Sequence, residues 1–179
     1  TAVAINEIYI DGIKRIVIER VTMELDQETD FYRYPLENKI NQLREDIMFL
    51  TQLRVMDQVM QEGARHASSA DQLADLLAQM MQTTPYYHAI TLVGVNDGRE
   101  WMRLERGIDG LQRVPTEKLT RNHEEYLTEA MRLSAGEIFL SSVHLLNEGG
   151  VIVKPYILMM DGVMPVYTPS QQLLGLVII

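Results

Sequence analysis

The chain of 179 residues contains no cysteine. This absence excludes disulfide bridges, thiolate nucleophiles and cysteine-ligated zinc, but it does not fix the compartment, because many exported domains lack disulfides. No apolar run approaches the roughly 18–20 residues that a membrane-spanning helix needs. The sequence also lacks an initiating Met and a signal-peptide pattern, so we expect it to be an excised segment of a longer protein.

Basic residues are few. There are 16 Lys and Arg against 25 Asp and Glu, which gives a net charge of −9, and the longest basic run is Lys14-Arg15. Binding to nucleic acid depends largely on Lys and Arg contacts to phosphate, so the charge argues against such a partner. The hydrophobic fraction of 46% and the charged fraction of 23% are those of an ordinary globular domain.

The first third of the sequence has a helical pattern. Apolar residues recur every three or four positions over residues 2–28 and again over 36–62, and Pro35 either kinks one long helix or separates two. A further short helix ends before Pro85. We therefore predict a helical leader over residues 1–62, with a kink or break near Pro35, and a single module over 63–179. A straight leader of this length would extend about 90 Å, so part of it should pack on another chain, most simply in a homodimer.

The period changes at Tyr86. Two strand-like runs flank Asn96-Asp97-Gly98, a strong hairpin signal, and a helical pattern over residues 116–136 follows. Three further strands are predicted after this helix, in chain order: Glu137–Leu145, Val151–Met160 with Val163–Tyr167, and Leu173–Ile179. This pattern predicts an α+β fold with an antiparallel sheet of about five strands and long helices packed on it.

Few residues are arranged for catalysis or metal binding. Ser142 and His144 share a strand face, but no nucleophile elbow accompanies them. The four histidines have no metal-ligand spacing, and we interpret His123 in "NHEEY" as part of a solvated helix face. We therefore expect no catalytic residue, no metal and no cofactor, and the domain is not predicted to be an enzyme.

Polar and aromatic residues interrupt the predicted strands. Trp101, Arg103 and Glu105 alternate with Met102 and Leu104. An Arg held among aromatic rings could anchor a small carboxylate. In the alternative, Arg103 is an edge-strand residue that pairs with Glu105 or Glu137, and the sequence leaves both interpretations open.

Several of these segments resemble one family. "GREWMRLE" is similar to a hairpin motif of extracytoplasmic PAS-like sensor domains, the PDC or Cache family, and "REDIMFLTQL" resembles their long N-terminal helix. The second half resembles theirs in the order of its turns: Ala135-Gly136-Glu137, Asn147-Glu148-Gly149-Gly150, Pro155-Tyr156, Pro165-Val166-Tyr167 and Gly175-Leu176-Val177. The resemblance covers residues 36–179. Asp161 stands near a position at which the family usually carries Arg.

The resemblance implies a ligand-sensing domain in the periplasmic part of an inner-membrane protein, with a membrane helix before Thr1 and another after Ile179. The whole protein would be a histidine kinase, a diguanylate cyclase or a chemoreceptor. The expected ligand is a small molecule, such as a carboxylate or an amino acid, and the expected pocket residues are Arg103, Trp101, Tyr126, Ser142, His144 and Tyr156.

Two other functions stay open at this point. One is a cytosolic PAS- or GAF-like regulatory domain that dimerises through its leader, and the other is an enzyme that uses Arg103 and His144. Hydrophobic spans flanking the segment in the full-length gene would separate the first of these from an extracytoplasmic sensor.

Overall fold

The computed structural model describes residues 35–62, 67–96, 98–107, 109–121, 123–148, 151–168 and 170–179. The chain divides into two compact units, Thr1–Gln42 and Leu43–Ile179. In the first unit the described residues, 35–42, are helical. The predicted helix before Pro35, and with it the question of a kink there, lies outside the described residues.

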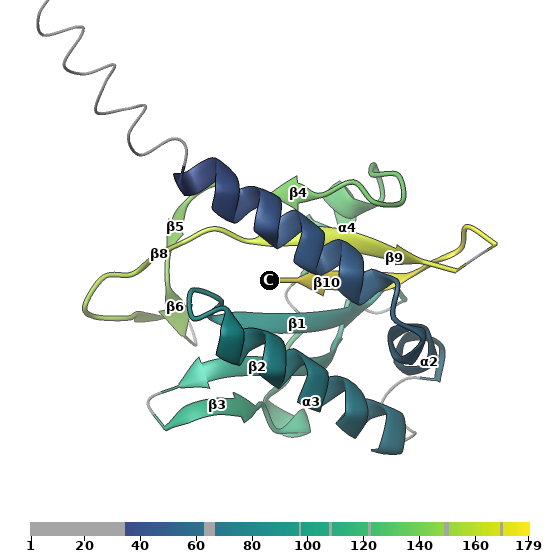
Figure 1. Cartoon of the computed structure of the whole chain (residues 1–179), viewed down its shortest axis with the longest axis horizontal. Coiled ribbons are helices and arrows are strands. Elements are labelled where there is room, and N and C mark those ends of the chain that lie inside the picture. Colours follow the sequence, from purple (N-terminus) through teal and green to yellow (C-terminus); the bar gives the residue numbers. More distant parts are fainter. Residues whose placement is uncertain are drawn as a thin grey trace, which may run out of the picture. The chain divides into compact units, whose positions relative to one another are not determined.

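The second unit is built on an antiparallel sheet of six strands, one more than predicted, and the predicted α+β class is confirmed (Figure 1). The added edge strand forms because residues after β2 turn back at Gly107 and Gly110 and pair with it. In spatial order the strands are β3 (Gly110–Arg113), β2 (Glu100–Gly107), β1 (Ala89–Gly94), β10 (Leu173–Ile178), β9 (Gly162–Tyr167) and β4 (Phe139–Leu140).

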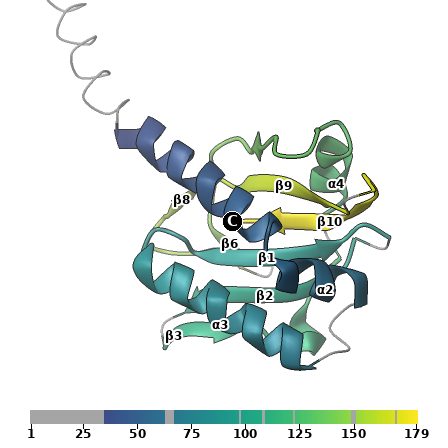
Figure 2. The same cartoon turned by 45° about the vertical axis from the view of Figure 1, so that its right-hand side comes forward.

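Helices cover one face of this sheet. They are residues 43–51 of a helix that spans 35–51, α2 (Arg54–Glu62) and α3 (Ala67–Thr83) (Figure 2). The prediction of one helix over 36–62 was wrong, because Gln52 and Leu53 interrupt it. Their N–H groups bond to carbonyls three residues back, each at 3.2 Å, and this tighter turn redirects the chain.

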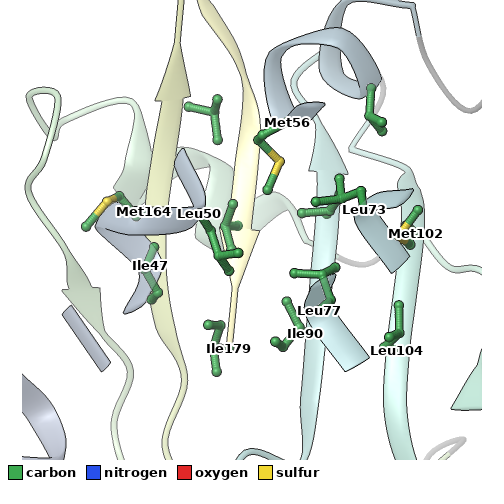
Figure 3. Packing of buried hydrophobic residues seen from close by; sticks show 14 of the residues in the cluster. Ile47, Leu50, Met56, Leu73, Leu77, Ile90, Met102, Leu104, Met164 and Ile179 are labelled. Carbon is green, nitrogen blue, oxygen red and sulfur yellow. The ribbon is translucent and has the colours of Figure 1, made fainter. Parts of the chain in front are cut away.

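The main hydrophobic cluster lies between these helices and the sheet (Figure 3). Leu73, Leu77 and Met81 follow one another at four-residue steps on α3, so all three point to the same face and are fully buried. They pack in a cluster with Ile90 on β1 and Met102 on β2. The amphipathic spacing of the helices thus accounts for the face that they bury.

The other face of the sheet is covered by α4 (Glu124–Ala130). A second cluster on this side joins Leu127 and Ala130 of α4 to residues of the central strands: Val93, Val163, Leu176 and Ile178. Because both faces are covered, the central strands β9 and β10 are apolar without alternation.

The segment between β4 and β9 departs from the predicted strands. It forms two small ribbons, β5 (His144–Leu145) with β8 (Leu158–Met159) and β6 (Asn147–Glu148) with β7 (Val151–Ile152). The predicted strands over 137–145 and 151–160 are therefore each reduced to short pairs. Leu146 of this segment is buried, but many of its apolar side chains are exposed: Val143, Val151, Ile152, Tyr156, Ile157 and Leu158.

The last residue is held in the sheet. Gly162 N–H donates to the carbonyl of Ile179 at 2.8 Å, and Ile179 N–H donates to the carbonyl of Gly162 at 3.0 Å. In the part of the chain that the structure describes, no helix has both the length and the apolar character needed to cross a membrane.

Candidate functional site

The candidate site starts from a bulge in β2. Leu92 of β1 pairs with Met102, but the next residue, Val93, pairs with Glu100, so one residue of β2 is extra. Side chains that precede the bulge therefore change face, and Glu100 lies on the same side of the sheet as Arg103. Trp101 packs instead against the main hydrophobic cluster.

The space for Trp101 comes from a neighbouring glycine. A Cβ atom on Gly94 would lie 2.6 Å from the indole ring of Trp101, so only glycine admits the ring there. Strict alternation of side chains along the strand predicted Trp101 beside Arg103. The bulge is the physical reason that the two side chains do not share a face.

Glu100 is the centre of the site. Its side chain is only 1% exposed, and burial of a carboxylate is costly unless its oxygens are hydrogen-bonded. Thr120 supplies two donors, its N–H at 2.9 Å and its hydroxyl at 3.1 Å. His123 Nε2 lies 2.8 Å from Oε1 of Glu100, and Arg103 Nη1 lies 3.2 Å from the same oxygen. The carboxylate is thus fully supplied with donors.

These partners set the ionisation of Glu100. Burial raises its pKa, but the hydrogen bonds from His123 and the Thr120 N–H and the charge of Arg103 outweigh that effect. The result is a pKa lowered from 4.5 to about 2. Glu100 therefore carries its charge at neutral pH.

His123 is fixed in one tautomer by this carboxylate. An ionised carboxylate only accepts hydrogen bonds, so Nε2 of His123 carries the proton that is shared with Glu100. The other ring nitrogen, Nδ1, is buried and has no hydrogen-bond partner among the described residues. The side chain is 15% exposed, so our interpretation of His123 as part of a solvated face was wrong.

Tyr126 continues the site along α4. Its ring stacks on His123 with centroids 6.3 Å apart, and it lies 6.2 Å from the ring of Phe139. The hydroxyl donates a hydrogen bond to the carboxylate of Asp161. Burial, reinforced by this bond and by the charge of Asp161, raises the pKa of Tyr126, which keeps the phenol protonated.

Asp161 joins these side chains to β5. Its N–H donates to Ser141 Oγ at 2.8 Å, and its carbonyl accepts from the N–H of Ser141 at 2.8 Å. His144 Nε2 lies 3.8 Å from Oδ2 of Asp161. Arg103, Glu100, His123, Tyr126, Asp161 and His144 thus form one row, which we call the polar row. A ring stack links His123 to Tyr126, and polar contacts make the other links.

The structure places the six predicted pocket residues differently. Arg103, Tyr126 and His144 are members of the polar row. Ser142 is exposed and contributes only its carbonyl, to which His144 Nδ1 bonds at 3.1 Å. Tyr156 is 65% exposed, with Lys154 Nζ 5.7 Å from its ring centroid.

Arg103 is committed to protein carboxylates. Besides Glu100, it has an ion pair with Glu105 at 3.4 Å, which is the pairing that the sequence left open. Its Nε atom is buried and does not have hydrogen-bond geometry with any described residue, Glu105 included. The charge of Arg103 is therefore largely neutralised within the protein.

Glu100, His123, Asp161 and Ser141 were not predicted as site residues. The three-residue step from His123 to Tyr126 at the start of a helix was a signal for two of the side chains on one face. Asp161 stood out only as a departure from the resemblance. Glu100 lies within "GREWMRLE", the hairpin motif on which the resemblance rests, but the face on which its side chain lies depends on the bulge.

The chemistry of the site is rich in acceptors. Glu100 and Glu105 contact the guanidinium of Arg103, Glu100 also contacts His123, and Asp161 lies near His144. Among the described residues, two buried nitrogen atoms of the site have no hydrogen-bond partner, Nδ1 of His123 and Nε of Arg103, the latter 3.4 Å from Oε2 of Glu105. Within the described ranges, no three His, Cys, Asp or Glu side chains are grouped so as to hold a metal ion.

Comparison with known proteins identifies the fold. No family model matches the sequence, and no curated protein matches it. Among solved structures, the chain is similar to a domain of a sensory box/GGDEF family protein from Vibrio parahaemolyticus, with a TM-score of 0.64 and 16% identity over 79% of this chain and 54% of that one. It is also similar to the extracellular domain of the histidine kinase vpHK1S-Z8, with a TM-score of 0.67 and 16% identity over 79% of this chain and 50% of that one.

The chain spans only about half the length of these two solved chains. At this level of identity the likeness concerns the fold and not the ligand or the output. The predicted PAS-like architecture, with a long helix on an antiparallel sheet, is confirmed: the chain has the fold of these two solved domains.

Proposed function

We propose that this chain is the extracytoplasmic ligand-sensing domain of a transmembrane signal-transduction protein, such as a histidine kinase, a diguanylate cyclase or a chemoreceptor. The observation that carries the proposal is the polar row, which lies on one face of a fold shared with the extracellular domain of a histidine kinase. The domain binds its ligand without chemical turnover. Ligand binding changes the packing of the domain, and this change is passed to the rest of the protein.

Two buried nitrogen atoms without a hydrogen-bond partner among the described residues support ligand binding at the polar row. Native proteins rarely leave buried polar atoms without a partner, and a ligand or an ordered water usually supplies one. His123 Nδ1 and Arg103 Nε both belong to side chains that contact the same oxygen of Glu100. A ligand that bonds to one of them is therefore close to the other.

The charges favour an amino acid over a simple carboxylate. A carboxylate bound at Arg103 Nε must compete with Glu100 and Glu105, which lie 3.2 and 3.4 Å from the guanidinium. An amino acid also carries an ammonium group, and the surrounding carboxylates attract it. We therefore propose a small zwitterion as the ligand.

A thermal-shift screen tests the proposal. The whole chain is mixed in turn with amino acids, carboxylates, amines and polyols. A ligand at 100 times its Kd should add about 2.7 kcal/mol to the free energy of unfolding. We expect an amino acid to stabilise the wild type and not Arg103→Ala. The control is Arg113→Ala, which removes an exposed Arg on β3 that pairs with Asp71 at 2.9 Å.

Absence of any stabilisation in a folded wild-type protein would contradict a small-molecule sensor. Stabilisation that survives Arg103→Ala would place the ligand elsewhere. A hit among simple carboxylates alone would contradict the zwitterion and retain the sensor.

We also propose that the protein acts as a homodimer through its N-terminal helices. The length of the predicted leader supports this, although most of that segment lies outside the described residues. Sedimentation of the whole chain tests it, and a monomer at all concentrations would contradict it.

A further inference from the structure

Asp161 occupies a junction between the polar row and the end of the chain. Its carboxylate accepts from Tyr126 of α4 and faces His144 of β5. The next residue, Gly162, is joined to Ile179 by two reciprocal hydrogen bonds of 2.8 and 3.0 Å. One covalent step therefore separates a carboxylate of the site from the backbone pair that holds the last residue.

We propose that Asp161 is a coupling residue that links the polar row to the C-terminal strand, and that the charge on His144 regulates this link. The inference deepens the proposed sensor function by naming a regulator of the same site, which is a proton. Neither the comparisons nor the fold assigns a role to either residue.

The geometry gives His144 two distinct nitrogen atoms. Nδ1 lies 3.1 Å from the carbonyl of Ser142, which can only accept, so Nδ1 carries the hydrogen of the neutral ring. Nε2, which faces Asp161 Oδ2 at 3.8 Å, is then the atom that gains a proton. Protonation turns a contact between a lone pair and a carboxylate into an ion pair.

This ion pair changes the balance at Asp161 Oδ2. The same oxygen accepts the hydrogen bond of Tyr126 and lies closest to His144. A protonated His144 draws the carboxylate toward β5, because ion pairs that also form a hydrogen bond shorten to about 2.7–2.9 Å. The backbone of Asp161 is bonded at both ends to Ser141, so the movement is passed along the chain to Gly162.

The groups that face Asp161 come from several elements. Tyr126 approaches from α4 and His144 from β5, and Glu125 acts on Tyr126 through its charge. His123 stacks on Tyr126 and is held by Glu100. Tyr126 thus contacts a second histidine, His123, and the experiment must separate the effect of His123 from that of His144.

The test is an NMR titration of the whole chain from pH 8 to pH 5, the range in which histidine side chains change charge. In the wild type we expect the amide signals of Gly162 and Ile179 to shift together with the ring signals of His144. In His144→Gln their shift over this range should be lost. In Asp161→Asn the two amide signals should stop following the ring signals of His144.

His88→Gln is the matched control, because His88 lies just before β1 and outside the polar row, and it should leave the shifts unchanged. Amide shifts that persist in His144→Gln would assign the effect to His123 and overturn the proposal. Amide signals that do not move in the wild type would overturn it as well. No ligand is used, so a failed ligand screen and a failed titration are separate results.

Discussion

Nε2 of His123 lies 2.8 Å from Oε1 of Glu100, a carboxylate that is 1% exposed. The imidazole belongs to the residue just before α4 and the carboxylate to β2, so this contact ties the helix cover to the sheet. The low pKa of Glu100 shows that the contact and its neighbours favour the ionised form. Stability should therefore depend on the charge of this buried group.

The first prediction concerns the loss of folding stability at acid pH. The pKa of Glu100 is lowered from 4.5 to about 2, so the unfolded chain takes up its proton first as the pH falls. The stabilisation is complete above pH 4.5 and is lost as the pH falls toward 2. One pKa unit corresponds to about 1.4 kcal/mol, so the loss over the whole window is about 3 kcal/mol. Urea unfolding at pH values from 7 to 2 measures it.

Glu100→Gln should remove this part of the pH dependence and flatten the curve. Glu117→Gln, which removes an exposed carboxylate of the Thr116–Lys118 turn, is the control and should keep the wild-type slope. If Glu100→Gln and wild type lost stability in parallel between pH 5 and pH 3, the assignment to Glu100 would be wrong.

The second prediction concerns the hydroxyl of Tyr126. Tyr126→Phe keeps the ring contacts to His123 and Phe139 but removes the hydrogen bond to Asp161. Hydrogen bonds to charged groups contribute about 1.5–3 kcal/mol, so we expect unfolding to become easier by about 2 kcal/mol. Tyr156→Phe alters a ring that is 65% exposed and should leave stability unchanged. Equal stability of the two variants would contradict the bond to Asp161.

The fold could be predicted where burial leaves a simple pattern. The unbroken apolar run of β10 reflects a strand covered on both faces, and the four-residue steps of Leu73, Leu77 and Met81 reflect a helix with one buried face. The break at Gln52 could not be predicted, since no proline or glycine marks it. It depends on how the helices meet the sheet.

The site was harder to predict because it depends on one extra residue. Alternation put Trp101 beside Arg103, whereas the bulge puts Glu100 there. The cause lies on another strand, because Gly94 makes room for the indole ring of Trp101. A local pattern cannot contain that information, and the error passed from one residue to the whole interpretation of the pocket.

The third prediction tests the main cluster with two adjacent residues of α3. Leu77 is fully buried, whereas Leu76 is 37% exposed. Leu77→Ala should lower the free energy of unfolding by about 2–5 kcal/mol, because it removes buried methyl groups and leaves a cavity. Leu76→Ala should cost less than about 1 kcal/mol. Chemical denaturation of both variants measures the difference, and a larger loss for Leu76→Ala would mean that α3 presents its other face to the sheet.

The last prediction concerns the approach of β1 and β10. A Cβ atom on Gly175 would lie 2.2 Å from the carbonyl oxygen of Val93, a backbone atom that cannot move without disturbing the sheet. Gly175→Ala should therefore destabilise the fold by about 3 kcal/mol or more. Gly107→Ala is the matched control, because its Cβ would meet only the end of the exposed Gln112 side chain, at 2.9 Å, which can turn away. Thermal unfolding compares the two. Because neither glycine has a positive φ, any difference is steric, and equal stability would contradict the pairing of Gly94 with Gly175.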